Sequence, residues 1–344
     1  MKTVRLVLVG LGNLGRRLCQ VLDAKRDDLR QRYDLDLVLV GAADSRGAAY
    51  DPLNGLDPAQ VADLKVDGGT VADYPGVGKR HWLAPALVGT AEADVLLEAS
   101  PVNLGQGAEP GLSCIRTALR RGLHVATPNK GPLVVAYQEL HELAAEHDAQ
   151  LRFDGTVAGG LPALYLGQRD LRGAVIERME AVPNLCTGYV MDMLADGMTW
   201  QDATERAHDA GVLEGDGSWD LEGWDAAAKL VILANAVLSQ PTTMDDVDIT
   251  GITDLDPEEL QAAKARGERY RLLVGGERQS DGSYTLSVAP VPLSSDHALG
   301  HLGPKQMGIL YETDIFGTIT AIIDEPTPVP SAATMLRDVL DIYV

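Results

Sequence analysis

Six residues near the N-terminus, Gly10-Leu11-Gly12-Asn13-Leu14-Gly15, constrain the fold of this chain more than any other feature. They follow Val4–Val9, an apolar run typical of a buried strand, and they open Asn13–Tyr33, where apolar residues recur at helical spacing. In that context Gly10 allows a tight turn, Gly12 lets the backbone approach a pyrophosphate, and Gly15 lets helix and strand pack closely. The helix N-terminus adds free N–H groups that attract phosphate. The segment predicts a dinucleotide-binding turn; the alternative is a tight turn without a ligand.

The alternation of strands and helices continues through the first half of the chain. We expect strands at Leu35–Ala43, Asp94–Glu98 and His124–Ala126, and helices at Leu112–Arg121 and Ala136–Ala149. This order is typical of an α/β fold with a Rossmann-type, doubly wound parallel sheet. We therefore expect a dinucleotide-binding domain over residues 1–150.

In the second half, predicted strands and helices are intermixed. This pattern is typical of a mixed α+β domain, which we expect over residues 151–318. The predicted strands are Ala174–Val182, Tyr270–Val274 and Thr285–Pro290, and the predicted helices are Thr199–Ala210, Trp224–Leu238 and Glu258–Gly267. The last segment, residues 319–344, contains the amphipathic run Ser331–Tyr343. Its apolar face predicts that it packs back on the first domain.

The charge balance and the cysteines limit the class of protein. The 344 residues include 50 acidic and 29 basic side chains, a formal net charge of −21, which argues against nucleic-acid or membrane-surface binding. Three widely spaced cysteines indicate free thiols in a reducing compartment. No signal peptide and no membrane-spanning run is predicted, so we expect a cytoplasmic protein.

The second predicted strand leads into Asp44-Ser45-Arg46. A carboxylate at this place usually accepts hydrogen bonds from the adenine ribose and favours NAD, whereas an arginine can pair with a 2′-phosphate and favours NADP. Asp44 could also be a turn residue, and Arg46 a solvated surface charge. The choice between NAD and NADP stays open, with NADP slightly favoured.

Two lysines lie in segments that indicate chemistry. Lys130 follows a predicted strand end, where ligands of doubly wound sheets bind. Lys229 shares a helix face with Asp225, and Glu214 and Asp220 crowd carboxylates into the glycine-rich segment before that helix. Such a cluster can bind a zwitterionic amino acid and move a proton. A surface ion pair behind a solvated acidic loop is the alternative.

The motifs GLGNLG, ATPNKGP and EGDGSWDLEGWDAAAK together resemble the homoserine dehydrogenases. The resemblance extends to DGTVAGGLP and PLSSDHALGHL and so covers nearly the whole chain. It implies NAD(P)-dependent interconversion of L-homoserine and L-aspartate 4-semialdehyde, a step in threonine and methionine biosynthesis. No regulatory ACT domain follows, so the resemblance is to the short monofunctional form. It also implies a second domain that forms a homodimer through its sheet, and the Thr285–Pro290 region is compatible with such pairing.

The resemblance assigns roles residue by residue. Lys130, Asp225 and Lys229 would serve the chemistry, with one lysine as proton donor and acceptor. The expected substrate contacts are Glu214, Asp220, Lys130 and Cys186. The expected cofactor contacts are Gly10, Gly12, Asn13, Leu14, Gly15, Asp44, Arg46 and Lys130. A monovalent cation, Na⁺ or K⁺, would bind at Asp154, Val157, Gly159 and Leu161, although Asp154 replaces the glutamate usual in the family.

Several residues depart from the family pattern on the substrate side. Leu185 replaces a glycine and Cys186 a threonine, in a segment interpreted as a substrate loop, and Trp219 is unusually bulky. Ile323–Pro328 also stands where a glycine-rich stretch is common. Two alternatives therefore stay open: a related dehydrogenase for another small oxo or amino acid, and a catalytically silent nucleotide-binding sensor. The retention of both lysines and Asp225 argues against the sensor.

Overall fold

The computed structural model describes residues 1–66, 68–213, 215 and 217–344, and the chain forms two compact units. Unit 1 comprises Met1–Gly160 and Thr327–Val344, and unit 2 comprises Leu161–Pro326. Among the helices of the described ranges, none combines the length and the apolar character needed to cross a bilayer.

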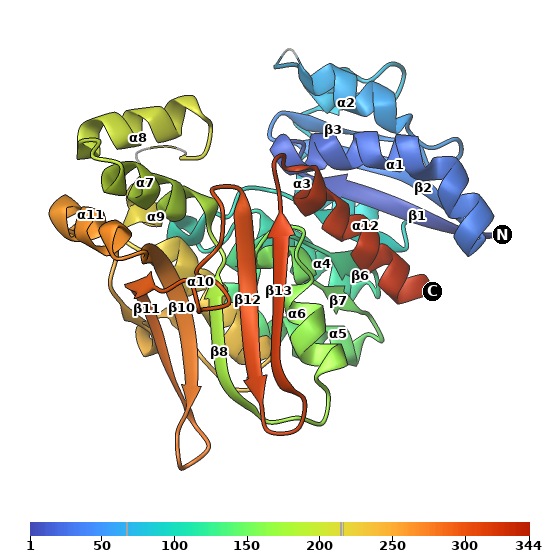
Figure 1. Ribbon diagram of the computed structural model, residues 1–344. Coiled ribbons are helices and arrows are strands. Elements are labelled where there is room, and N and C mark those ends of the chain that lie inside the picture. The colour runs from blue at the N-terminus through green and yellow to red at the C-terminus, as the bar shows by residue number, and fades with distance from the viewer. Residues whose placement is uncertain (67, 214, 216) are drawn as a thin grey trace. The chain divides into compact units, whose positions relative to one another are not determined.

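Unit 1 is built on a seven-stranded sheet of order β4-β3-β2-β1-β5-β6-β7 (Figure 1). Strands β2, β1, β5, β6 and β7 are parallel, which confirms the predicted doubly wound sheet, while β3 and β4 add antiparallel pairs at one edge. The sequence did not predict these two edge strands because they are too short for an apolar pattern. The strands are β1 Lys2–Val9, β2 Leu35–Asp44, β3 Gly47–Tyr50, β4 Gly78–Arg80, β5 Val95–Glu98, β6 His124–Ala126 and β7 Leu151–Arg152.

The helices of unit 1 connect these strands. They are α1 Asn13–Tyr33, α2 Pro58–Val66, α3 Ala84–Thr90, α4 Gly111–Arg120, α5 Lys130–Glu146 and the C-terminal α12 Val329–Tyr343. Strand β1 pairs with β2 on one side and β5 on the other. The carboxyl ends of β1 and β5 thus flank the point where ligands of doubly wound sheets bind.

Helix α1 begins and ends where its sequence predicts. Its buried face carries Leu18 and Leu22, which share an apolar core with Leu6 of β1 and with Met335 and Val339 of α12. In Figure 1, α12 lies beside α1 within this unit. The C-terminal helix is therefore part of the apolar core that supports the nucleotide turn.

Helix α5 begins at Lys130, before the predicted start at Ala136, where a non-helical backbone (φ −141°, ψ 34°) divides it into two helical segments. Pro132 does not prevent this early start, because proline is tolerated in the first turn of a helix, where an N–H has no intrahelical partner. The side chain of Asn129 caps this turn by accepting a hydrogen bond from the Gly131 N–H, at 3.1 Å. Lys130 is consequently the first residue of a helix.

Unit 2 contains a six-stranded sheet of order β13-β12-β8-β10-β11-β9. All neighbours are antiparallel except β9 and β11. The strands are β8 Ile176–Val182, β9 Asp248–Ile249, β10 Arg269–Arg278, β11 Tyr284–Leu293, β12 Gln306–Thr313 and β13 Gly317–Asp324. The helices are α6 Ala163–Tyr165, a π-helical turn Leu166–Asp170, α7 Leu185–Ala195, α8 Trp200–Asp209, α9 Ser218–Leu221, α10 Trp224–Ala236 and α11 Pro257–Ala265.

A buried ion pair fastens α7 to the sheet of unit 2. The guanidinium of Arg271 on β10, only 2% exposed, donates to both carboxylate oxygens of Asp192 on α7, at 2.8 and 3.0 Å. It also donates to the carbonyls of Tyr270 and Leu302. A buried charge requires such complete pairing. The pair fixes α7, whose first turn contributes to the candidate active site.

Candidate active site

The glycine-rich turn after β1 is closed on one side and open on the other. A Cβ on Gly10, whose φ is +88°, would lie 2.3 Å from the backbone of Ala99, and a Cβ on Gly15 would lie 1.9 Å from the Gly10 carbonyl oxygen. A Cβ on Gly12 would meet no atom within 4 Å, and no side chain caps the N-terminus of α1. The turn therefore leaves space and helix N–H groups in front of Gly12, which fits a dinucleotide pyrophosphate.

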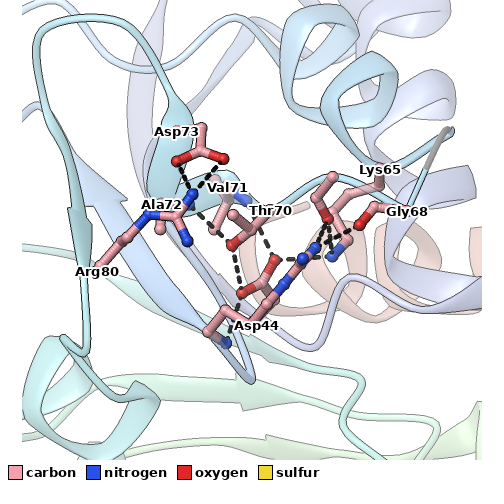
Figure 2. Close-up of polar contacts among 10 residues, drawn as sticks. Asp44, Lys65, Gly68, Thr70, Val71, Ala72, Asp73 and Arg80 are labelled. Carbon is pink, nitrogen blue, oxygen red and sulfur yellow. Dashed lines mark hydrogen bonds and ion pairs between the residues drawn. The ribbon is translucent and has the colours of Figure 1, made fainter.

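Asp44, the last residue of β2, is held by four donors (Figure 2). One carboxylate oxygen accepts from the Arg46 N–H and the Thr70 hydroxyl, both at 2.9 Å. The other accepts from the Lys65 ammonium at 2.7 Å and the Val71 N–H at 3.1 Å. Burial alone would raise the pKa of Asp44, but these hydrogen bonds outweigh it and lower the pKa below its usual value. The carboxylate is thus ionised and already engaged.

Two cations accompany Asp44. Lys65 also donates to the Gly69 carbonyl at 2.8 Å, and the guanidinium of Arg46 donates to the carbonyls of Gly68 and Gly69. A sugar hydroxyl at this place would compete with existing donors for the carboxylate. Sequence reasoning selected Asp44 and Arg46 but missed Lys65 and Thr70, because Lys65 lies in the last turn of α2 and Thr70 follows that helix, both remote in sequence from the end of β2.

A buried carboxyl group organises the strand ends beside Lys130. Glu98, at the end of β5, is fully buried, and this burial raises its pKa. Its carboxylate accepts from the Ser100 N–H at 2.8 Å, and its carbonyl accepts from the Thr127 hydroxyl at 2.8 Å. Thr127 in turn accepts from the Asn129 N–H at 3.0 Å. These bonds fix the segment between β6 and α5 and therefore the start of the helix at Lys130.

In unit 2, Asp225 and Lys229 lie one turn apart on α10 and form an ion pair at 2.9 Å. Their side chains are 9% and 13% exposed, so water screens the pair little. The Lys229 ammonium also donates to the Pro183 carbonyl and to Asn184 Oδ1, each at 2.9 Å. Three oxygens thus match its three N–H bonds and fix its position.

Asn184 joins the two carboxylates of this site. Its Nδ2 donates to Asp225 at 2.7 Å and lies 3.5 Å from a carboxylate oxygen of Asp220, while its Oδ1 accepts from Lys229. The Cys186 thiol donates to Asp220 at 3.1 Å. Asn184 was not among the residues selected from the sequence. It precedes α7, and only the fold brings it to α10.

The thiol of Cys186 is a neutral donor. Burial, and next the nearby charge of Asp220, raise its pKa to about 12. At neutral pH the thiolate is scarcely populated, so this group does not serve as a nucleophile.

The segment interpreted from the sequence as a substrate loop is helical. Leu185–Gly188 forms the first turn of α7, with Asn184 at the N-cap position in an extended conformation. Leucine has a higher helix propensity than the glycine usual there, and a run of apolar residues continues the helix. The loop interpretation was wrong for this physical reason.

The other selected residues are distributed over both units. Glu214 lies outside the described residues. Asp154, Val157 and Gly159 lie in unit 1, and Leu161 is the first residue of unit 2. The Asp154 carboxylate is paired with the guanidinium of Arg337 on α12. Within the described ranges, no cluster of three or more histidine, cysteine or carboxylate side chains could hold a metal ion.

Protein-family models match both parts of the chain. Residues 10–154 match the model described as homoserine dehydrogenase, NAD binding domain, and residues 162–340 match the model described as homoserine dehydrogenase. Together with the open space in front of Gly12, these matches define an NAD(P)-dependent oxidoreductase.

Curated relatives narrow the class. The NAD(+)-dependent homoserine dehydrogenase of Pseudomonas canavaninivorans is 31% identical over 343 residues, which cover 100% of this chain and 97% of that protein. The homoserine dehydrogenase of Methanocaldococcus jannaschii is 32% identical, with 98% of each chain covered. The chain belongs to the homoserine dehydrogenase family.

Two solved structures agree with this assignment. The homoserine dehydrogenase of Thermoplasma acidophilum superposes with a TM-score of 0.84 at 26% identity and covers 99% of both chains. A hyperthermophilic archaeal homoserine dehydrogenase in complex with NADPH has a TM-score of 0.84 at 25% identity, with 99% of this chain and 97% of that chain covered.

Substitutions of two neighbouring glycines should separate cofactor binding from stability. In Gly12→Ala the new methyl group enters that open space, so we expect the Kd for NADPH to rise about tenfold or more, a loss of about 1.4 kcal/mol, at an unchanged melting temperature. In Gly15→Ala the methyl group meets the Gly10 carbonyl, and overpacking should lower the free energy of unfolding by about 1–3 kcal/mol. Fluorescence titration and urea denaturation measure the two effects. Equal melting temperatures for both variants would contradict this account of the turn.

Proposed function

We propose that Lys229, held by Asp225 and Asn184, moves the proton when this enzyme interconverts L-homoserine and L-aspartate 4-semialdehyde. The main support for this role is that three oxygens fix the Lys229 ammonium in a nearly buried site. A nicotinamide cofactor, when bound, accepts the hydride from the alcohol carbon or returns it to the aldehyde. The substrate oxygen would replace one of the three acceptors of Lys229. In aldehyde reduction the ammonium would donate a proton to that oxygen as the hydride reaches the carbon, and in alcohol oxidation the neutral amine would accept the hydroxyl proton as the hydride leaves.

The remaining side chains would bind and orient the substrate. A zwitterionic amino acid carries an ammonium group, which Asp220 and Glu214 would pair with. The Cys186 thiol holds Asp220 by a hydrogen bond, and the neutral state of that thiol leaves the carboxylate as the only anion of the two. Lys130, fixed at the start of α5, would contact cofactor and substrate and is the alternative proton carrier.

We propose NADP as the preferred cofactor. Asp44 is saturated by four donors, whereas Lys65 and Arg46 place two positive charges beside it. A 2′-phosphate would gain from both cations, while the 2′-hydroxyl of NAD would have to displace a donor from Asp44.

We also propose which unit binds which ligand and how two copies of the chain associate. Unit 1 would bind the dinucleotide, and unit 2 would bind the substrate and form a cytoplasmic homodimer through its sheet. In support, the β12–β13 hairpin at one edge of that sheet exposes Ile315, Phe316 and Ile322, at 62%, 49% and 46%. An exposed apolar edge of this kind calls for a partner.

Removal of the proposed proton carrier tests the mechanism. In Lys229→Met, which keeps the length and loses the ammonium, we expect the NADP-dependent oxidation of homoserine to fall by about 10³-fold or more. The Kd for NADPH should stay unchanged. Lys264→Met, which removes an exposed lysine of the same unit, is the control and should retain activity. Turnover that survives in Lys229→Met would assign the proton to Lys130, with Lys130→Met as the deciding variant.

Asn184→Ala tests the positioning of Lys229. We expect kcat to fall about 10–100-fold with a smaller change in KM, because the ammonium loses one oxygen and Asp225 one donor. The deuterium isotope effect with homoserine labelled at the alcohol carbon should increase as the chemical step becomes limiting. Asn235→Ala is the matched control, because Asn235, on the helix of Lys229, also bonds through both side-chain atoms, but its hydrogen bonds go to the backbone of Val231 and Thr242. Similar kcat losses in both variants would indicate a purely structural role for Asn184.

The cofactor proposal is tested at Lys65. In Lys65→Ala we expect the ratio of kcat/KM with NADP to kcat/KM with NAD to fall about tenfold, the loss of one charge-assisted contact. Arg80→Ala, which removes the exposed partner of Asp73 nearby in Figure 2, should leave the ratio unchanged. An unchanged ratio in Lys65→Ala would exclude Lys65 as a determinant of cofactor choice.

A further inference from the structure

The loop after β7 is closed by a side chain of the C-terminal helix. The guanidinium of Arg337 pairs with the carboxylate of Asp154 and donates to the carbonyl of Gly160 at 3.0 Å. The Asp154 side chain is fully buried, and that of Arg337 is 34% exposed. One cation of the protein thus links the carboxylate at the start of this loop with a carbonyl at its end.

Local packing makes this contact possible. A Cβ on Gly155 would lie 2.1 Å from Oγ1 of Thr334, so only glycine lets α12 approach the loop this closely. One turn farther along α12, Asp341 pairs with Arg152 of β7 at 2.5 Å. The helix is therefore fastened on either side of the loop, and Arg337 is held over Asp154.

This arrangement does not fit the monovalent cation that the family resemblance implies. The site that the resemblance implies combines the carboxylate of Asp154 with oxygens of Val157, Gly159 and Leu161. Here the Asp154 carboxylate, the charged member of that set, already accepts from the guanidinium of Arg337, which also binds the carbonyl of Gly160 between Gly159 and Leu161. A Na⁺ or K⁺ ion against Asp154 would lie beside a like charge that cannot be deprotonated. Aspartate is also one methylene shorter than the glutamate usual in the family.

We propose that Arg337 takes the place of the monovalent cation in this chain and that the enzyme works without Na⁺ or K⁺. A guanidinium on a packed helix cannot dissociate, so the loop keeps its geometry whatever the salt. The proposal rests on the assignment of this loop as the family's cation site, and not on the proposed roles of Lys229 or Lys130.

The first test replaces the cation around the intact enzyme. Activity and melting temperature are measured in NaCl, KCl and tetramethylammonium chloride at one ionic strength, so that general screening is equal. We expect all three salts to give the same values for both quantities. A loss of activity or a lower melting temperature in tetramethylammonium chloride alone would overturn the proposal. Since the melting temperature needs no substrate, a wrong assignment of the reaction would not be confused with this result.

The second test removes the guanidinium. In Arg337→Met we expect a lower melting temperature that NaCl or KCl restores in part and tetramethylammonium does not, because Asp154 becomes available to a cation. Arg337→Lys should behave as the unmodified enzyme, and it also provides a folded variant should Arg337→Met not fold. Arg152→Met, which breaks the other ion pair of α12, is the control and should lose stability without gaining a cation response. The same response in Arg337→Met and Arg152→Met, or none in Arg337→Met, would overturn the proposal.

Discussion

The close packing of helix α1 on strand β1 is the constraint on which the nucleotide-binding unit depends. It requires Gly15 to lie against the Gly10 carbonyl and Gly10 to lie against Ala99, where no side chain has room. This contact points the N-terminus of α1 toward the space in front of Gly12. The core shared by α1, β1 and α12 then stabilises the geometry from behind.

A second principle is the fixed pairing of carboxylates with cations. Asp44 is paired with Lys65, Asp154 with Arg337 and Asp225 with Lys229, and in each pair the carboxylate is at most 9% exposed. An unpaired buried charge would destabilise the fold. Each carboxylate is therefore paired with a cation, and the pairing holds it in one orientation. We propose a different consequence for each pair. The pair at Asp44 favours NADP, the pair at Asp154 replaces a monovalent cation, and the pair at Asp225 positions the proton carrier.

The residues that interact locally were predictable, and those that depend on remote contacts were not. Helix Asn13–Tyr33 and the pair Asp225–Lys229 follow from helical periodicity, and the structure has both. Lys65 and Asn184 carry no local signal, because each acts on a residue that the fold brings to it from another element. Helix α7 was missed because its start was interpreted by analogy with a glycine-containing loop.

The sequence by itself determined the family, the doubly wound sheet and the glycine turn, because these depend on patterns within short segments. The tertiary structure decided which charges that lie far apart in the sequence meet. Arg337 lies far along the chain from Asp154, and only the packing of α12 against Gly155 brings the two together. Electrostatic pairing acts over a few ångströms in space whatever the separation along the chain, so partners that are remote in sequence become visible only in the folded protein.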